Sequence, residues 1–400
     1  KEEARPMRIL HTADWHLGRT LEGRSRMAEQ ESLVDELARL VDEERIDLVL
    51  IAGDVYDSVN PPAAAEQLFY EALTRLGADG RRPVAVIAGN HDHPDRVTAA
   101  LPLASRQSIR MVGLPTAETL SIPVPSAGQT ARLYALPYPS EARLNTVLAE
   151  QADERLPQQA YSGKIAALIE RQRASFGSDT VNLIMSHLYV AGGRESESER
   201  PIQVGGAYTV EAAAFSTAAQ YAALGHLHRA QTIRAPIPVR YCGSPIAFSF
   251  SEAGQAKSVT VVDVNPGEPA RWTEIPLSSG RPLVRWHAAG GIAEVERWVA
   301  EGRDSSAWIE LHLHVSDALS MEDIHRLRRM HGGIIHIRPV FPERQRETRV
   351  SDRSGLPIGE LFKQFYARQT GGAEPEPELV SLFLDLVKDD NASGDGGDAA

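Results

Sequence analysis

Residues 47–57, DLVLIAGDVYD, decide the fold. The apolar run at 48–52 is typical of a strand that is buried on both faces, and it stops abruptly at Gly53 and Asp54. A glycine lets the backbone turn sharply and approach another group closely. Asp54 then places a carboxylate at the carboxyl end of the strand, where open α/β sheets bind ligands. A Gly-Asp pair on its own is more commonly a cap for the next helix, so the role of Asp54 depends on its neighbours.

Four more apolar stretches end in side chains that can bind metal ions. Residues 7–11 precede TADWH at 12–16, residues 83–88 precede GNHDH at 89–93, residues 181–185 precede SH at 186–187, and residues 221–224 precede GHLH at 225–228. A single histidine at a strand end is usually structural, but five such ends in series are not a surface pattern. They supply aspartate, asparagine and histidine without a thiolate, which suits two divalent ions such as manganese, iron or zinc.

The five clusters resemble the sequence blocks of calcineurin-like metallophosphoesterases. The matching residues are Asp14-x-His16, Gly53-Asp54-x-x-Asp57, Gly89-Asn90-His91-Asp92, His187 and Gly225-His226-x-His228. The resemblance implies an α/β fold, a four-layer α/β/β/α sandwich. It also implies one metal site at Asp14, His16 and His228, and a second at Asn90, His187 and His226. Asp54, central in chain order and at the end of a central strand, is predicted to bridge the two ions.

Three other residues of these clusters are candidates for the chemistry itself. The family places its catalytic histidine at the position of His91, so the resemblance assigns His91 as a general acid or phosphate-positioning residue. Asp92 is expected to orient His91, and Asp57 to orient ligands or water without binding a metal. We interpret His11 as a buried strand residue and His93 as a surface residue.

Three stretches narrow the resemblance to the nuclease subunits of bacterial double-strand-break complexes. They are LHTADWHLG at 10–18, YAALGHLHRAQ at 221–231 and YCGSPIAFSF at 241–250. The resemblance is strong over residues 7–265. In the remainder of the chain, only the general layout of the predicted segments is similar. It implies a manganese-dependent 3′→5′ double-strand exonuclease and endonuclease, acting on duplex ends, hairpins and single strands. It further implies a homodimer within a heterotetramer completed by a coiled-coil ATPase. This chain has no GxxxxGK[ST] motif, so ATP hydrolysis is expected from that partner.

Composition bounds the cellular setting. The apolar fraction is 42% and no apolar run approaches the roughly 18 residues of a membrane span. One cysteine, Cys242, excludes an intrachain disulfide, and we read it as a small core residue. We therefore expect a cytoplasmic, nucleoid-associated protein with no membrane contact. The formal charge of −12 argues neither for nor against DNA, because residues 374–400 hold eight acids and one lysine, which is −7 of that total.

The chain is predicted to divide into four parts. A nuclease domain spans 7–265, with 239–250 and 258–264 as strands that complete its second sheet. A small α+β capping domain at 280–341 reads β-α-β-α-β. A charged linker then precedes a helical partner-binding segment at 356–388, made of two short amphipathic helices, and a disordered tail at 389–400. The histidines of the capping domain (His312, His314, His331 and His336) are expected on the surface or on a sheet face.

Several alternatives stay open. A phosphoesterase acting on a small molecule or a phosphoprotein would share every metal ligand, and a metal-bound scaffold without catalysis is a third possibility. The His91-Asp92 pair argues against the scaffold, because a scaffold needs no general acid. The polar segment at 191–206 is either a disordered surface loop or a loop that shapes access to the site. The two C-terminal helices either dock on their own chain or bind a partner protein.

Overall fold

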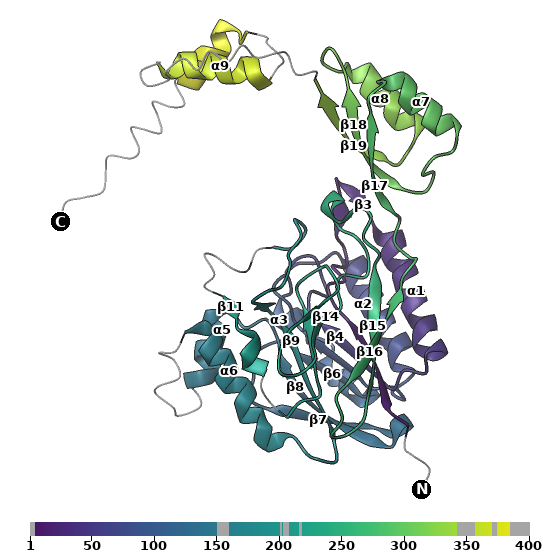
Figure 1. Cartoon of the computed structure of the whole chain (residues 1–400), viewed down its shortest axis with the longest axis vertical. Coiled ribbons are helices and arrows are strands. Elements are labelled where there is room, and N and C mark those ends of the chain that lie inside the picture. Colours follow the sequence, from purple (N-terminus) through teal and green to yellow (C-terminus); the bar gives the residue numbers. More distant parts are fainter. Residues whose placement is uncertain are drawn as a thin grey trace, which may run out of the picture. The chain divides into compact units, whose positions relative to one another are not determined.

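The computed structural model describes residues 5–149, 160–200, 202, 208–215, 218–341, 357–369 and 374–384. It divides into two compact units, Lys1–Val284 and Arg285–Ala400 (Figure 1). The first unit holds two six-stranded sheets. Within the described ranges, no helix combines the length and the apolar character that crossing a membrane requires.

The first sheet contains the buried strand at residues 48–52. Its order is β16-β15-β1-β4-β5-β6. The strands are β1 (Met7–Thr12), β4 (Leu48–Ala52), β5 (Val84–Ile87), β6 (Ile109–Val112), β15 (Ser258–Val264) and β16 (Arg271–Pro276). β1, β4, β5 and β6 run parallel, whereas β15 and β16 are antiparallel to their neighbours. All five residues of β4 are buried, as a central strand covered on both faces requires.

The second sheet follows the same plan. Its order is β13-β14-β12-β9-β8-β7. The strands are β7 (Thr119–Val124), β8 (Gln129–Leu136), β9 (Val181–His187), β12 (Tyr221–Gly225), β13 (Gln231–Ile233) and β14 (Val239–Tyr241). The four central strands are parallel and the two edge strands are antiparallel.

Three apolar clusters hold the layers together. The helices α1 (Met27–Glu43) and α2 (Ala63–Gly77) cover the first sheet, and α5 (Glu141–Ala149) and α6 (Tyr161–Arg171) cover the second (Figure 1). A third cluster lies between the sheets and joins β1 and β4 to β9 and β12, with Leu50 and Leu183 among its members. The predicted four-layer α/β/β/α sandwich is confirmed. Shorter elements lie in the connections: β2 (Thr20–Leu21), β3 (Arg24–Ser25), α3 (Pro94–Val97), α4 (Leu101–Ala104), β10 (Tyr189–Val190) and β11 (Thr209–Val210).

One prediction about the strands is wrong. Residues 239–250 form a strand only at Val239–Tyr241, and Ser258–Val264 joins the first sheet beside β1 instead of completing the second. After Tyr241 the chain turns at Gly243, where φ is +80° and an added Cβ would lie 2.7 Å from the backbone N of Ala230. Alternating apolar residues identify a strand and its buried face but not its partner, because either sheet offered an edge to pair with.

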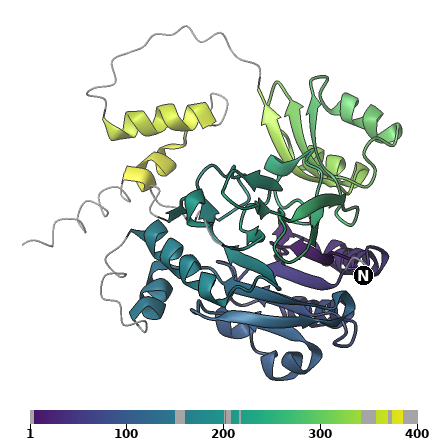
Figure 2. The same ribbon diagram turned by 60° about the horizontal axis from the view of Figure 1, so that its bottom comes forward.

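The second unit has its own small sheet, in the order β17-β18-β19. Its elements are β17 (Leu283–Ala288), α7 (Ile292–Ala300), β18 (Trp308–His314), α8 (Met321–Met330) and β19 (Ile334–Val340), which is the predicted β-α-β-α-β layout. The two helices lie on one face of the sheet (Figures 1 and 2). Ser320 and Asp323 begin α8 with a reciprocal capping box. Among the described residues, none of the capping-domain histidines belongs to a group of side chains close enough together to hold a metal ion.

Two helices follow within the second unit. α9 spans Ile358–Gln369, and a shorter helix spans 377–384. The rings of Phe362 and Phe383 stack with centroids 4.1 Å apart, so the two helices contact each other. The predicted linker at 342–355 and the tail at 389–400 lie outside the described residues. The functional boundaries at 265, 280 and 356 stay predictions.

Glycines at the strand ends allow the two sheets to approach each other. A Cβ at Gly225 would lie 2.0 Å from the carbonyl oxygen of Ala52, and one at Gly53 would lie 2.4 Å from Nδ1 of His187. A Cβ at Gly89 would lie 2.1 Å from Oδ1 of Asp54. A side chain at Gly53 or Gly225 would push the carboxyl ends of the two sheets apart, and one at Gly89 would collide with Asp54 within the first sheet.

We expect Gly225→Ala to lower the free energy of unfolding by about 3 kcal/mol, because its methyl group meets backbone that cannot move aside cheaply. Gly77→Ala is the matched control, since its Cβ would have no neighbour closer than 3.7 Å. Urea denaturation of the two variants checks the prediction. Similar midpoints for both would contradict the close approach.

Candidate metal centre

The candidate site lies where the carboxyl ends of both sheets meet. β1, β4 and β5 of the first sheet lead into Asp14, His16, Asp54 and Asn90, and β9 and β12 of the second lead into His187, His226 and His228. Parallel strands end at one edge, and the glycines described above let the two edges converge. All seven residues are therefore brought together, and only Asn90 is partly exposed.

The backbone of this centre is unusual. Asp14, His16, Asp54 and His226 have φ values of 56°, 45°, 50° and 105°, in the left-handed region that non-glycine residues rarely adopt. Each such residue costs roughly 1–2 kcal/mol relative to a right-handed conformation. Strain of this kind persists where the surrounding structure fixes it, and it gathers at functional sites. These turns lie where the carboxyl ends of the two sheets meet, and they bring the four residues close together.

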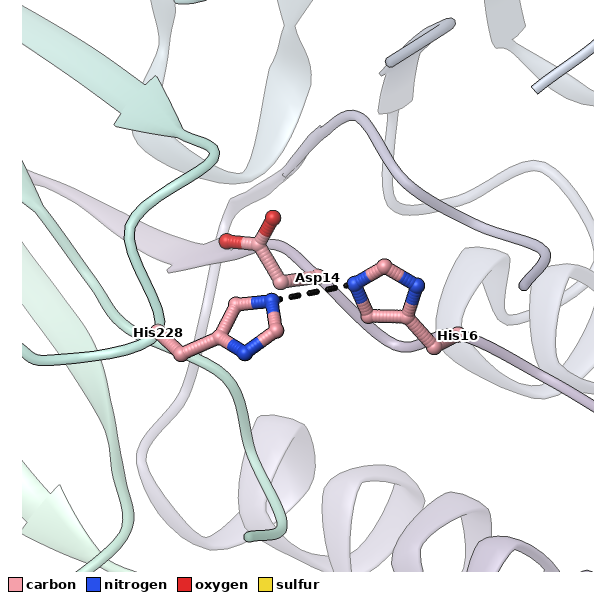
Figure 3. A group of neighbouring side chains, drawn as sticks. All are labelled: Asp14, His16 and His228. Carbon is pink, nitrogen blue, oxygen red and sulfur yellow. Dashed lines mark hydrogen bonds between the residues drawn. The ribbon is translucent and has the colours of Figure 1, made fainter. Parts of the chain in front are cut away.

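Asp14, His16 and His228 form one group (Figure 3). Nε2 of His16 and Nε2 of His228 lie 3.1 Å apart. The carboxylate of Asp14 accepts a hydrogen bond from the backbone N–H of His226, with 3.0 Å between N and Oδ1. One ligand atom from each of the three residues lies within 4.8 Å of the other two. A single metal ion could bind all three atoms at this spacing.

Asp54 stands between that group and a second one. Its Oδ2 lies 3.6 Å from Nε2 of His16 and 3.5 Å from Nε2 of His187. Nε2 of His187 also lies 2.9 Å from Oδ1 of Asn90. The Asp54 carboxylate thus reaches histidines from both sheets, which is the placement that a shared ligand needs.

Burial and the attraction between neighbouring charges shift the pKa values of the buried residues. Burial alone would raise the pKa of Asp54, but the charge and hydrogen bond of His187, with the charge of His16, hold it well below its usual range. Burial lowers the pKa of His187, but the charge and hydrogen bond of Asp54, the charge of Asp14 and the hydrogen bond to the Ala52 carbonyl together outweigh burial and raise it to about 9. Burial lowers the pKa of His16 to about 3 and that of His226 well below its usual value. An ion that took His187 as a ligand would therefore have to displace a proton, whereas the lowered pKa values favour the neutral form of His16 and His226.

The donor set fits divalent metal ions. It combines two carboxylates, an amide oxygen and four imidazoles. Among the described residues, the buried Nε2 of His226 has no hydrogen-bond partner. A buried polar atom left without a partner calls for an explanation, and an ion at this position supplies one.

His91, Asp57 and Asp92 lie beside the centre. Nδ1 of His91 is 2.8 Å from the carbonyl oxygen of Asp57, and Oδ1 of Asp57 is 3.5 Å from Nδ1 of His16. The predicted orientation of His91 by Asp92 is wrong. The Asp92 carboxylate instead accepts hydrogen bonds from the backbone N–H groups of Val55, Tyr56 and Gly89. It holds the turn that carries Asp54, because buried amides without strand partners need an acceptor.

Two residues that the sequence did not single out hold His228 in place through hydrogen bonds. Glu199 accepts a hydrogen bond from the backbone N–H of His228 at 2.8 Å, and Oγ of Ser198 lies 2.7 Å from its Nδ1. Both belong to the polar segment at 191–206, whose described part is thus attached to the site. The sequence signal was only a concentration of serine and glutamate after His187, which cannot distinguish a solvated loop from a ligand support.

A buried ion pair lies behind His228. Lys257 donates hydrogen bonds to the carbonyl oxygen of His228 at 3.0 Å and to Oγ of Ser244 at 2.9 Å, and it pairs with Glu252. Burial would raise the pKa of Glu252, but its hydrogen bond with His228 and the charge of Lys257 hold it below its usual range. Outside the centre, His11 is fully buried against Tyr221, and His93 is exposed.

Two family models match the chain. The model of the calcineurin-like phosphoesterases matches residues 7–230, which include every candidate ligand. A model described as the Type 5 capsule protein repressor C-terminal domain matches residues 279–370. The phosphoesterase fold, together with the clustered donors, implies that the centre holds divalent metal ions.

Curated relatives narrow the family. The SbcD subunit of the nuclease SbcCD from Bacillus subtilis (strain 168) is 56% identical over 382 residues, which cover 95% of this chain and 98% of that protein. The protein of the same name from Rhodobacter capsulatus is 38% identical over 298 residues, covering 71% of this chain and 72% of that protein. The chain therefore belongs to the calcineurin-like phosphoesterases and, within them, to the SbcD family of nuclease subunits.

Proposed function

We propose that this chain hydrolyses DNA phosphodiester bonds with two divalent ions, most simply manganese, as the nuclease subunit of a complex with an SbcC-type ATPase. The observation that carries the proposal is the Asp54 carboxylate, whose Oδ2 lies 3.6 Å from His16 and 3.5 Å from His187. Digestion of end-labelled duplex and single-stranded DNA with Mn²⁺, beside p-nitrophenyl phosphate, tests it. Hydrolysis of the small ester without DNA cleavage would favour a small-molecule or phosphoprotein phosphoesterase instead.

Each proposed ligand is assigned to one of the two ions or is shared by both. Asp14, His16 and His228 would hold one ion, Asn90, His187 and His226 would hold the other, and Asp54 would be shared. When bound, such an ion pair polarises phosphoryl oxygens and lowers the pKa of a bound water. Asp14 and Asp54 bring two negative charges against the four positive charges of the ions. The remaining positive charge faces an incoming phosphate, because the asparagine and the histidine ligands are neutral when they bind.

We expect Asp54→Asn to weaken metal binding at both sites, and His16→Ala to weaken mainly one, because only a shared carboxylate serves two ions. Titration calorimetry with Mn²⁺ should show the wild-type protein binding two ions, Asp54→Asn with both affinities reduced, and His16→Ala with one retained. Loss of the same single site in both variants would contradict the shared role.

His91 is proposed to act on the substrate directly. A carbonyl oxygen only accepts hydrogen bonds, so the 2.8 Å contact with Asp57 fixes the hydrogen of His91 on Nδ1. Nε2 is then free to face the substrate, and in the doubly protonated imidazolium form it can donate a hydrogen bond to a phosphate oxygen or give its proton to the leaving oxygen. His91 is only partly buried, as a group that meets substrate must be.

We expect His91→Ala to keep both metal ions and to lower kcat for DNA cleavage by at least about a hundredfold, because it removes a proton donor and not a ligand. His93→Ala, two residues away and exposed, is the control and should cleave normally. Elemental analysis and a gel-based nuclease assay are the measurements. Metal loss, or cleavage near the wild-type rate, would contradict the assignment.

The helix pair is the proposed binding surface for the ATPase. Phe365 is 58% exposed and Leu382 is 57% exposed, and Leu361 and Leu379 are more than a third exposed. Two short helices cannot bury such stripes on each other alone. An apolar helix face of this kind fits a groove in another protein. A homodimer within a heterotetramer, and a cytoplasmic location with the nucleoid, complete the proposal.

We expect deletion of residues 356–400 to abolish co-purification with the SbcC-type ATPase and to leave Mn²⁺-dependent cleavage of single-stranded DNA intact. Phe365→Asp should reproduce the binding defect, because it places a charge in the apolar stripe. Gln364→Asp, at the exposed neighbouring position, should not. A deletion that still binds the ATPase at full affinity would rule out this surface.

A further inference from the structure

Arg19 stands at the solvent side of the metal centre. Its backbone N–H donates to the carbonyl oxygen of His16 at 2.9 Å, which closes the turn after that ligand. The histidine and aspartate ligands are buried, whereas Asn90, His91, Asp57 and Arg19 are partly exposed. These four residues mark the side from which a substrate reaches the ions, and Arg19 is the only permanent cation among them.

The guanidinium of Arg19 is held in place from two sides. Its Nη2 donates to the carbonyl oxygen of Ser198 at 3.1 Å. Its Cζ lies 5.0 Å from the ring centroid of Phe248. Phe248 in turn contacts the proposed ligands His16 and His228, with ring centroids 5.1 Å and 5.5 Å apart. The cation is therefore fixed relative to the centre before any substrate arrives, which lowers the entropy that binding has to overcome.

The contacts of Arg19 do not use all of its hydrogen-bond donors. Among the described residues, its buried Nη1 has no hydrogen-bond partner, and its ion-pair contact with Oδ1 of Asp57 spans 3.6 Å. That separation is too long for a hydrogen bond. A guanidinium offers five donors in a planar fork that matches phosphate oxygens.

We propose that Arg19 binds a phosphate of the DNA strand beside the scissile one, and so favours polynucleotides over small phosphodiesters. The proposal rests on the DNA nuclease function proposed above. The scissile phosphate belongs between the ions near Asp54, whereas the Arg19 guanidinium lies against Phe248 and near Asp57, outside the set of ligands. A strand that crosses the centre would bring its next phosphate to that side.

The test compares two substrates at several salt concentrations. For the metal-loaded Arg19→Ala protein, KM for a single-stranded oligonucleotide should rise about tenfold, and the slope of log KM against log salt should fall by about 0.7, the value for one lost phosphate contact. Arg19→Gln should behave alike, and Arg19→Lys should keep the slope because it keeps the charge. With bis(p-nitrophenyl) phosphate, which has no second phosphate, the rise in KM should be several-fold smaller.

Arg39→Ala is the matched control for loss of one positive charge. Arg39 is 63% exposed on α1 and pairs with the exposed Glu43 one turn along the helix, so its removal should leave the salt slope unchanged. An unchanged slope in Arg19→Ala would overturn the proposal. Equal losses on both substrates, or a lower metal content, would also overturn it, because they would mean that Arg19 merely supports the centre. A wild-type protein that cleaves only the small ester would instead refute the nuclease function.

Discussion

The carboxylate of Asp54 is the point on which the two halves of the sandwich depend. It sits in a left-handed turn after β4, within 3.6 Å of histidine nitrogens from both sheets, and its own turn is held by Asp92. Buried charges are costly unless they are paired. The centre therefore joins the sheets electrostatically at one edge, while the apolar cluster between them does so along the rest of their length.

Sequence reasoning located this edge because its signals are local. An apolar strand, a glycine and a ligand-type side chain occur within a few residues, and the parallel arrangement brings the strand ends together. It placed β15 in the wrong sheet, because strand periodicity carries no information about the partner strand. It also gave Asp92 the wrong neighbour. The carboxylate serves three backbone amides, and the demand of such amides for an acceptor is visible only once the turn is known.

Support for the ligands comes from far along the chain and could not have been read from spacing. Ser198 and Glu199 reach His228 across 29 or 30 positions, and Lys257 does so across 29. Their signals in the sequence are ordinary charged and polar residues. The residues that hold the ligands in place are thus harder to identify from sequence than the ligands themselves. Their hydrogen bonds nevertheless fix the orientation and basicity of the ligand rings.

The order of the elements also bears on how the protein is made. β1 lies between β4 and β15, and the last ligand, His228, precedes β15 by thirty residues. Chains fold from the N-terminus as they leave the ribosome, one domain at a time. A nascent chain therefore carries its early ligands without a complete centre until the ribosome has passed His228, and β1 lacks one neighbour until it has passed Val264. With this layout, the proposed centre can assemble only after most of the domain has been synthesised.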